Sequence, residues 1–465
     1  MFGVCSLQAH AQESQEQQGG TPPKPAARVY SLPIGGSDQE NNQQENNLQP
    51  DDHPLTGLQA LTLGTQTERH SYWIPGISYS NAIQPNGFNV GGGNDWISTS
   101  YLTGNMSLLE AFSHSKLGIN YSGGEFFSTD SAVGNGQFHQ LALDQEFRWE
   151  RWQLTFIDQF SYLPQTQFGF GGGTNLGTPG TGGSLNPSSP GLSGNNTANQ
   201  TIFSGVGPRY MNSGAAQINY QMTPRNSITL GGVYGILRFT ETGNIESDDI
   251  IGTAGYNYEI SRRDTIGILY RFTAYHFLGN PQAIRDQVAN IAYGRKITGR
   301  LALQLFGGPE ITQFRVPIGT QHQSIAGSGG ATLLYGFERG SVSLNYSHGV
   351  TSGSGVFTGA QTDQVQAAAN WKLSRVWSGN LGAGYAKNRN AALPSGVQGQ
   401  NFDTVFASAG LSRPLGRNAI FSLGYSAYIQ RTGLSACSGS QCNTTNDTHQ
   451  ITISFSWQTR PFVLH

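Results

Sequence analysis

The feature that most constrains this chain is an alternation of apolar and small polar residues with a period of two. From about Ser71 onward, aromatic or aliphatic residues alternate with Gly, Ser, Thr and Asn, as in residues 342–347, 377–385 and 451–457. This period puts the apolar side chains on one face of a β-strand. The alternating stretches cover about 9–14 residues, longer than strands of soluble sheets and close to a bilayer-spanning strand. They predict a sheet with one face toward lipid and the other toward a lumen.

The composition favours a membrane barrel over a soluble core. Only 36% of the residues are hydrophobic and 12% are charged, against about 45–50% and about 25% in soluble domains. The net charge of −2 gives no field that would recruit nucleic acid. The sequence has no run of about 18 apolar residues for a transmembrane helix. A closed barrel is then the way for a membrane-embedded chain to satisfy its backbone hydrogen bonds.

Short polar turns, most of them basic, divide the alternating region into hairpins. Their spacing is roughly 35–41 residues, with one gap of about 74, and longer connections rich in Gly, Asn and Ser lie between them. Alternating short and long connections are typical of outer-membrane barrels, in which the short turns are periplasmic. The turns lie near Lys116, Arg151, Arg225, Arg262 and Arg263, Lys296, Arg339, Arg375, and Arg413 to Arg417.

Counting from these turns predicts an all-β, antiparallel, up-and-down transmembrane barrel of about 18 strands. About eight short turns join about 16 strands. Residues 450–457 add one strand, and closure with an even number requires one more before the strand at residues 97–112. Residues 72–82 meet that need, because Pro75 is tolerated at an edge or at a strand start. Both termini are then periplasmic. Sixteen strands is the alternative, if residues 72–82 do not pair.

The segment before the barrel has a different composition. Residues 12–70 are rich in Gln, Asn, Glu and Pro and nearly lack aromatic residues, which predicts a disordered periplasmic tail. Ala9-His10-Ala11 has the form of a signal-peptidase site, although the residues before it are few and lack a basic region. We expect residues 1–11 to be a truncated signal-peptide remnant and residues 71–465 to be the barrel. A chance match to the cleavage site is the alternative.

Aromatic residues near the short turns are expected to form a girdle where the barrel wall meets the headgroups. The alternative is the general preference of aromatic residues for strands. The expected girdle residues are Trp149, Trp152, Tyr220, Tyr258, Tyr293, Phe337, Trp371 and Trp377.

Strand parity places a sparse set of polar side chains on the lumen face. Ile266, Ile268 and Tyr270 are expected to face lipid, for example, so Arg271 faces the lumen. Such charges form either selectivity rings or structural networks, and their mixed signs predict no strong ion selectivity. The lumen-facing candidates are Asp144, Glu146, Arg148, Glu259, Arg271, Gln304, Gln364, Gln366, Asn370 and Lys372. Arg238 is expected on the apolar face near a strand end, where it reaches the headgroups.

Two long connections have features of their own. Residues 165–208 contain no charged residue and are dense in Gly, Asn, Ser and Pro. This segment either folds inward as a constriction that selects by size or stays outside as a flexible loop. Cys437 and Cys442 flank four residues in the last connection, and in an oxidising compartment they predict a disulfide. Two free thiols are the alternative.

No motif in the sequence points to catalysis. It has no Gly-x-Ser-x-Gly elbow, phosphate loop, His-Glu-x-x-His or Cys-x-x-Cys pair. We therefore expect no enzymatic activity, no catalytic residues, no metal and no cofactor.

The alternating hairpins, basic turns such as residues 261–264, and the Ile-x-Ile-x-Phe-x-Trp ending resemble outer-membrane β-barrel porins. In particular they are similar to the loosely defined β-barrel porin families of diderm bacteria, over about residues 71–462. The resemblance implies insertion into outer-membrane lipid by the barrel assembly machinery, which reads an aromatic-rich last strand. Trp457 here is followed by residues 458–465, with Phe462 near the end.

Two functions compete at this stage. A barrel of about 16–18 strands leaves an aqueous lumen, which predicts a porin-like channel for passive diffusion of small hydrophilic solutes. The alternative is a non-channel barrel that acts in surface adhesion or exopolysaccharide export, as the resemblance allows. A lumen filled by ordered loops would favour the alternative. A soluble secreted β-protein is disfavoured by strand length and by the low charge.

Overall fold

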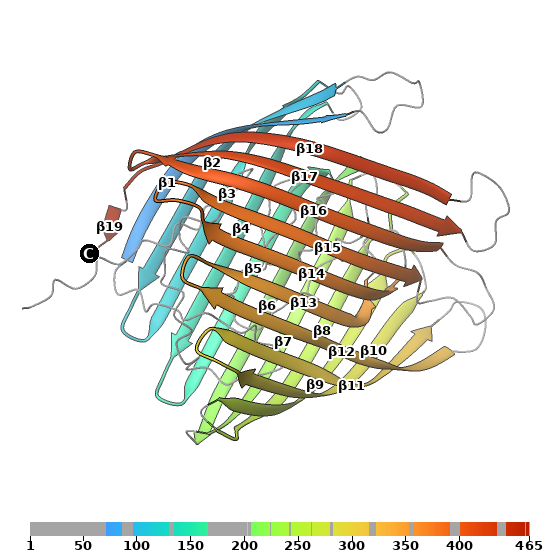
Figure 1. Ribbon diagram of the computed structural model, residues 1–465. Helices are drawn as coiled ribbons and strands as arrows, with labels where there is room; N and C mark the ends of the chain where they lie inside the picture. The colour runs from blue at the N-terminus through green and yellow to red at the C-terminus, as the bar shows by residue number, and fades with distance from the viewer. Residues whose placement is uncertain are drawn as a thin grey trace, which may run out of the picture.

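The chain forms one closed antiparallel barrel, seen in a computed structural model (Figure 1). The structure describes residues 71–85, 96–129, 134–165, 202, 206–223, 225–240, 243–261, 263–279, 282–315, 322–352, 358–390, 400–434, 443–460 and 462–464. The predicted signal-peptide remnant (residues 1–11), the predicted tail (residues 12–70) and the two cysteines of the last long connection lie outside these residues. The described residues include no helix with the length and hydropathy needed to cross a membrane.

Eighteen long strands, each of 12–18 residues, and one short strand make up the sheet. They are β1 Ser71–Pro85, β2 Trp96–Ala111, β3 Ser115–Ser128, β4 Asn135–Arg148, β5 Trp152–Gln165, β6 Val206–Thr223, β7 Asn226–Phe239, β8 Ser247–Glu259, β9 Asp264–Phe277, β10 Ala283–Lys296, β11 Leu301–Arg315, β12 His322–Phe337, β13 Gly340–Thr351, β14 Ala360–Lys372, β15 Ser378–Asn390, β16 Gln400–Leu415, β17 Ala419–Leu434, β18 Asn443–Gln458 and β19 Phe462–Leu464.

The first and last long strands close the barrel. β1 pairs with β2 on one side and antiparallel with β18 on the other, from Gly76 opposite Gln458 to Ile83 opposite Ile451. Each remaining long strand pairs with its neighbours in sequence, so the sheet has no free edge. The prediction of 18 strands, including one at residues 72–82, is confirmed.

Pro75 sits inside this closed sheet rather than at an edge. The pairing of β1 with β18 stops at Gly76, and its pairing with β19 starts at Trp73 opposite Phe462. Pro75 falls in the gap between these two partners, where its missing N–H breaks no ladder. Its carbonyl accepts a hydrogen bond from the Thr459 N–H at 3.0 Å. Phe462 therefore belongs to a separate short strand that extends the closing seam.

The turns that the sequence predicts as short lie at one end of the barrel, with the start of β1 and the end of β18, as Figure 1 shows. Side chains organise several of these turns. The Ser261 hydroxyl accepts the N–H groups of Arg263 and Asp264, each at 3.1 Å, and donates to the Asp264 carboxylate at 2.7 Å. Such local bonds explain why polar residues punctuate the chain at these points.

The two faces of the wall differ in the way that the alternation predicts. Large apolar side chains on one face are open to the surroundings, with exposed fractions of 62% for Ile268, 62% for Ile291 and 73% for Ile325. An apolar surface that continues around a whole barrel indicates contact with lipid.

Two pairs of packed aromatic rings mark the height of this apolar band. Trp152 packs on Tyr220 with ring centroids 4.3 Å apart, and Tyr162 packs on Tyr210 at 4.7 Å. Ten residues separate the pairs along both β5 and β6. With a rise of about 3.3 Å per residue and a tilt of about 35–45°, this gives about 25 Å, the height of the apolar band of an outer-membrane barrel.

Candidate functional site

The candidate site lies inside the barrel, where β13 reaches across to strands that are not its neighbours. The Tyr275 hydroxyl on β9 donates to the Val350 carbonyl on β13 at 3.3 Å, and the Val350 N–H donates to Glu310 Oε1 on β11 at 3.3 Å. Strands this far apart in the sheet meet only across the concave side. The face that carries Tyr275 and Glu310 is therefore the lumen face, and the exposed apolar face is the outside.

This contact arises because β13 leaves β12 before either strand ends. The pairing of β12 with β13 stops at Gly329 opposite His348, while the rest of β12 pairs with β11 alone. The last residues of β13 stay paired with β14, from Val350 opposite Gln361 to Thr351 opposite Ala360. The described residues at the end of this hairpin, 349–352 and 358–361 (here the hairpin end), therefore lean into the lumen.

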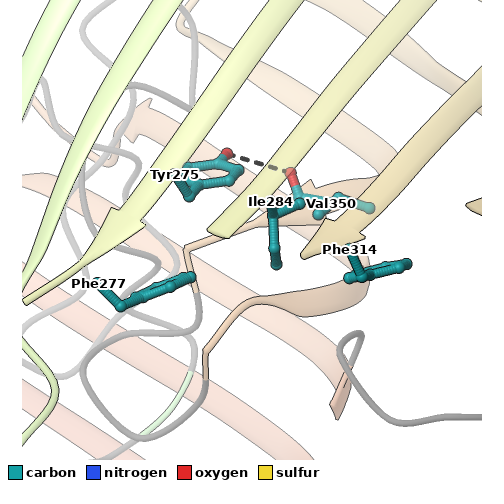
Figure 2. Close-up of a cluster of buried hydrophobic side chains, with 5 residues drawn as sticks. All are labelled: Tyr275, Phe277, Ile284, Phe314 and Val350. Atoms are coloured by element: carbon teal, nitrogen blue, oxygen red, sulfur yellow. Dashed lines mark hydrogen bonds between the residues drawn. The ribbon is translucent and has the colours of Figure 1, made fainter. Parts of the chain in front are cut away.

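A buried hydrophobic cluster holds the hairpin end against β9–β11. Figure 2 shows Val350 beside Tyr275 and Ile284, with Phe277 and Phe314 at the two sides. Gly359 packs on the same cluster from the other arm of the hairpin. It has φ +87°, and a Cβ at this position would collide with Ile284 Cδ1. Glycine alone meets both conditions without strain.

Ionisable groups surround this cluster on the inner wall. Arg271 Nη2 lies 3.7 Å from Asp286 Oδ2, and the Thr312 hydroxyl donates to Asp286 Oδ1 at 2.9 Å. Asp286 is 1% exposed and Glu310 is 0% exposed, and Asp249 is also buried. Burying carboxyl groups is costly unless they are hydrogen-bonded or paired. The Val350 N–H is therefore part of what makes this wall stable, so wall and hairpin end support each other.

A second segment reaches the hairpin from the opposite side. Ile202, which lies shortly before β6, is 1% exposed and packs with Ala360 of β14 and Phe402 of β16. In the sheet order β6 stands nearly opposite β14–β16. Ile202 therefore lies inside the lumen, against the inner wall opposite β6. Within residues 165–208 the structure describes only Gln165, Ile202 and residues 206–208, and this contact favours the inward-folded interpretation over the external one.

The two contacts form one bridge across the lumen. Ala360, which Ile202 touches, directly follows Gly359, which touches Ile284. The inner wall of β9–β11 is thus connected through the hairpin end and Ile202 to the inner wall of β14–β16. We call this arrangement the lumen bridge. It lies toward the end of the barrel that carries the long connections.

The expected lumen candidates share the face opposite the exposed apolar side chains, but they are spread over five strands. On β4, Glu146 accepts hydrogen bonds from Arg148 at 2.6 Å and from Gln153 at 2.8 Å. Of the ten candidates, Arg271 is the one that takes part in the group around the hairpin end. The others are Asp144, Glu146 and Arg148 on β4, Glu259 on β8, Gln304 on β11, and Gln364, Gln366, Asn370 and Lys372 on β14.

Asp286 and Glu310 were missed by parity for identifiable reasons. On β10, Asp286 alternates in step with Ile284 and Val288, which a parity rule assigns to lipid but which the structure buries on the inner wall. Glu310 shares its parity with Gln304, but Gly307, Gly308 and Pro309 interrupt the alternation between them.

The expected girdle residues lie at or next to short turns. Trp149, Trp152 and Tyr258 are exposed, and Trp377 is covered by the Arg413 guanidinium, whose carbon lies 5.6 Å from the ring centroid. Tyr293 donates its hydroxyl to Asp264 at 2.7 Å. Arg238 lies on the outer face near the end of β7, where it pairs with Asp248. Within the described residues, no group of three or more His, Cys, Asp or Glu side chains is arranged to hold a metal ion.

Known proteins resemble the chain in shape rather than in sequence. No protein-family model and no curated protein matches it. The outer membrane protein OpdK of Pseudomonas aeruginosa is 11% identical, covers 83% of this chain and 98% of its own, and has a TM-score of 0.43. A BenF-like porin from Pseudomonas fluorescens is 10% identical over 85% and 99% of the two chains, with a TM-score of 0.42. The ferric citrate transporter FecA is 9% identical over 85% and 80%, also with a TM-score of 0.42. Similarities of this size do not assign the chain to a family.

Proposed function

We propose that this chain is an outer-membrane channel of the porin type, through which small hydrophilic solutes pass by diffusion. The lumen bridge is the observation that carries the proposal, because it narrows a wide barrel at one level. A barrel of 18 strands without such a bridge leaves a broad aqueous lumen. With it, passage depends on the size of the solute.

The membrane location follows from the outer face. The apolar band of about 25 Å, bounded by two pairs of packed aromatic rings, matches the hydrocarbon layer that barrels of this kind span. We place the short-turn end, with both ends of the barrel strands, in the periplasm, since short turns face that side in outer-membrane barrels. Residues 12–70 then form a periplasmic tail, and the barrel assembly machinery inserts residues 71–465.

The inner wall toward the short turns supports a water-filled path. The side chains of Asp144, Arg148 and Lys372 are exposed there, which an apolar or packed lumen would not allow. Their signs are mixed, so weak ion selectivity is expected. At the bridge, the buried Ile202 and Val350 carry no charge, and the carboxyl groups of Asp286 and Glu310 are buried as well.

A second candidate function is supported by the same bridge. If it fills the lumen completely, the barrel acts as a scaffold for surface adhesion or polymer export rather than as a pore. The burial of Ile202, Val350 and Phe402 inside the barrel favours this candidate, because it leaves little apolar surface for a passing solute to touch.

Single-channel conductance of the refolded full chain in a planar bilayer separates the two. We expect stable, weakly ion-selective steps. Folding and insertion are checked first by heat-modifiable migration on a gel. Electrical silence from protein that passes this check would reject the channel and leave the scaffold role.

A further inference from the structure

A carboxyl group faces lipid at the middle of the apolar band. Asp158 is the seventh of the 14 residues of β5, and its side chain points outward with the exposed Phe156. It lies six residues from Trp152 and four from Tyr162, the rings that mark the two limits of the band. Other outward-facing charged side chains, such as Arg238 and Lys387, lie toward the long-connection ends of their strands, where they reach headgroups.

Asp158 is too short and too deep to reach either interface. At about 2.5 Å of height per tilted residue, Tyr162 lies about 10 Å above it. Its one hydrogen-bond donor in the described wall is the Asn212 amide of β6, at 3.1 Å from Oδ1, and that amide also donates to the Gln159 carbonyl. No cation of the described residues pairs with it. An ionisable group at this depth is costly in lipid and indicates a protein partner.

A hydrogen-bond donor lies on the same row of the outer face, where a row means the outward-facing residues in register on neighbouring strands. Asp158 is in register with Gly214 of β6, and Gly214 is in register with Tyr234 of β7. Tyr234 is 51% exposed to the outside. No hydrogen bond links its hydroxyl to Asp158 within one copy, and the space above Gly214 contains only the Asp158 carboxylate, 3.4 Å from where a Cβ would stand. The row thus carries an acceptor and a donor on the two sides of a glycine.

The adjacent row of outward-facing residues is made of small residues and forms a flat surface. Ala216 of β6, Gly232 of β7 and Gly252 of β8 follow one another in register on the outer face, between Phe156 and Phe272. A Cβ on Gly252 would meet no atom within 4 Å. Small residues of this kind let two membrane-embedded surfaces approach closely.

We propose that the outer face of β5–β8 binds a second copy of this chain, with Asp158 of each copy accepting a hydrogen bond from the Tyr234 hydroxyl of the other. A twofold axis along the membrane normal near Gly214 exchanges the two sides of the row and so sets donor against acceptor twice. The long phenol side chain covers the difference in depth that the strand tilt gives to the two residues. The inference rests on the proposed membrane location.

A second copy fits this surface better than lipid or an unrelated protein. Lipid tails offer no hydrogen-bond donor to a carboxyl group. Rotation about the membrane normal keeps every residue at its own depth, so a second copy brings its polar row into the same part of the apolar band as Asp158. The surface is also complementary to itself, with an acceptor, a glycine and a donor in order.

Cysteine pairing between copies tests the interface. We replace the native cysteines with serine and mix chains carrying D158C with chains carrying Y234C in the same liposomes. Oxidation should give disulfide-linked dimers in the mixture, at least fivefold more than in a matched pair, Leu344→Cys with Ala383→Cys. The matched residues also flank a small residue on one outer row, but on the other side of the barrel.

The uncrosslinked protein gives an independent readout. Light scattering of the native chain in detergent should report a dimer, and Y234F should raise its dissociation constant about eightfold, since two hydrogen bonds in a membrane are worth about 1.2 kcal/mol together. Heat-modifiable migration confirms that each variant is folded. A folded, inserted chain that is monomeric, or cross-linking no higher than in the matched pair, overturns the interface. A dimer that conducts no current contradicts the proposed channel and leaves the interface intact.

Discussion

At the residue scale, two side chains hold the backbone of one residue in the lumen bridge. Tyr275 donates to the Val350 carbonyl and Glu310 accepts from the Val350 N–H. A net hydrogen bond of this kind is worth about 1 kcal/mol. Removing one should therefore shift the equilibrium between the bridged arrangement and a state in which the hairpin end has left the wall about fivefold. We expect Tyr275→Phe to increase the time spent in larger conductance steps by about that factor, measured by single-channel recording.

The matched control for Tyr275 lies on the other face of the same strand. The Tyr270 hydroxyl donates to Gln287 on the outside of the barrel at 3.1 Å, so Tyr270→Phe removes a hydrogen bond without touching the bridge. It should leave the conductance pattern unchanged. Equal effects of the two substitutions would mean that Tyr275 acts through general stability and not through Val350.

Gly359 gives a second test at this scale. Gly359→Ala adds both left-handed backbone strain and a collision with Ile284, whereas Gly416→Ala at φ +80° meets no atom and adds strain alone. The strain costs about 1–2 kcal/mol in either variant. We expect Gly359→Ala, and not Gly416→Ala, to raise the conductance, because in Gly359→Ala the hairpin end must move away from the wall. Urea unfolding and conductance of both variants separate the two effects, and unchanged conductance in Gly359→Ala would contradict the packing described.

At the scale of elements, the strands and their turns could be predicted from the sequence, but the departure of β13 from β12 could not. The alternation and the basic turns predict where the strands lie and, outside stretches such as the start of β10, which face their residues take, and both follow from local physics. Nothing local distinguishes residues 349–352 and 358–361 from the ends of other Gly- and Ser-rich connections. Their inward position depends on Glu310 and Ile284, which are distant in sequence. Contacts of that kind leave no periodic signal.

The same limit applies to the connection between β5 and β6. Its lack of charge was compatible with an inward or an external position, and the contact of Ile202 with Ala360 and Phe402 favours the former. We expect Ile202→Ala to weaken the bridge by about 2–3 kcal/mol, as for other buried apolar truncations, and to enlarge the conductance. Because Ile202 and Phe402 share one contact, adding Phe402→Ala should give less than the sum of the two single effects. Full additivity would place Ile202 elsewhere.

At the scale of the whole molecule, the pairing of the first and last strands closes the barrel and leaves the sheet without a free edge. The sequence favoured 18 strands over 16, because an even number and the two terminal stretches fit that count, and the pairing of β1 with both β2 and β18 confirms it. It did not specify how the seam ends. That detail depends on Pro75, which the structure places between β18 and β19 where no N–H is required.

The seam makes a prediction about assembly. Deleting residues 461–465 removes β19 and its pairing with Ser71 to Trp73, together with the contact of Phe462 on Trp73, whose ring centroids are 5.5 Å apart. The pairing of β18 with β1 from Gly76 to Ile83 remains. The truncated chain should therefore still close, migrate as a heat-modifiable band and conduct, but unfold at lower urea concentration. Because the lumen bridge lies at the opposite end of the barrel, the conductance of the truncated chain should match that of the full chain. Loss of the heat-modifiable band would mean that β19 is needed for closure itself, and the seam would then include the residues beyond Gln458 as an essential part.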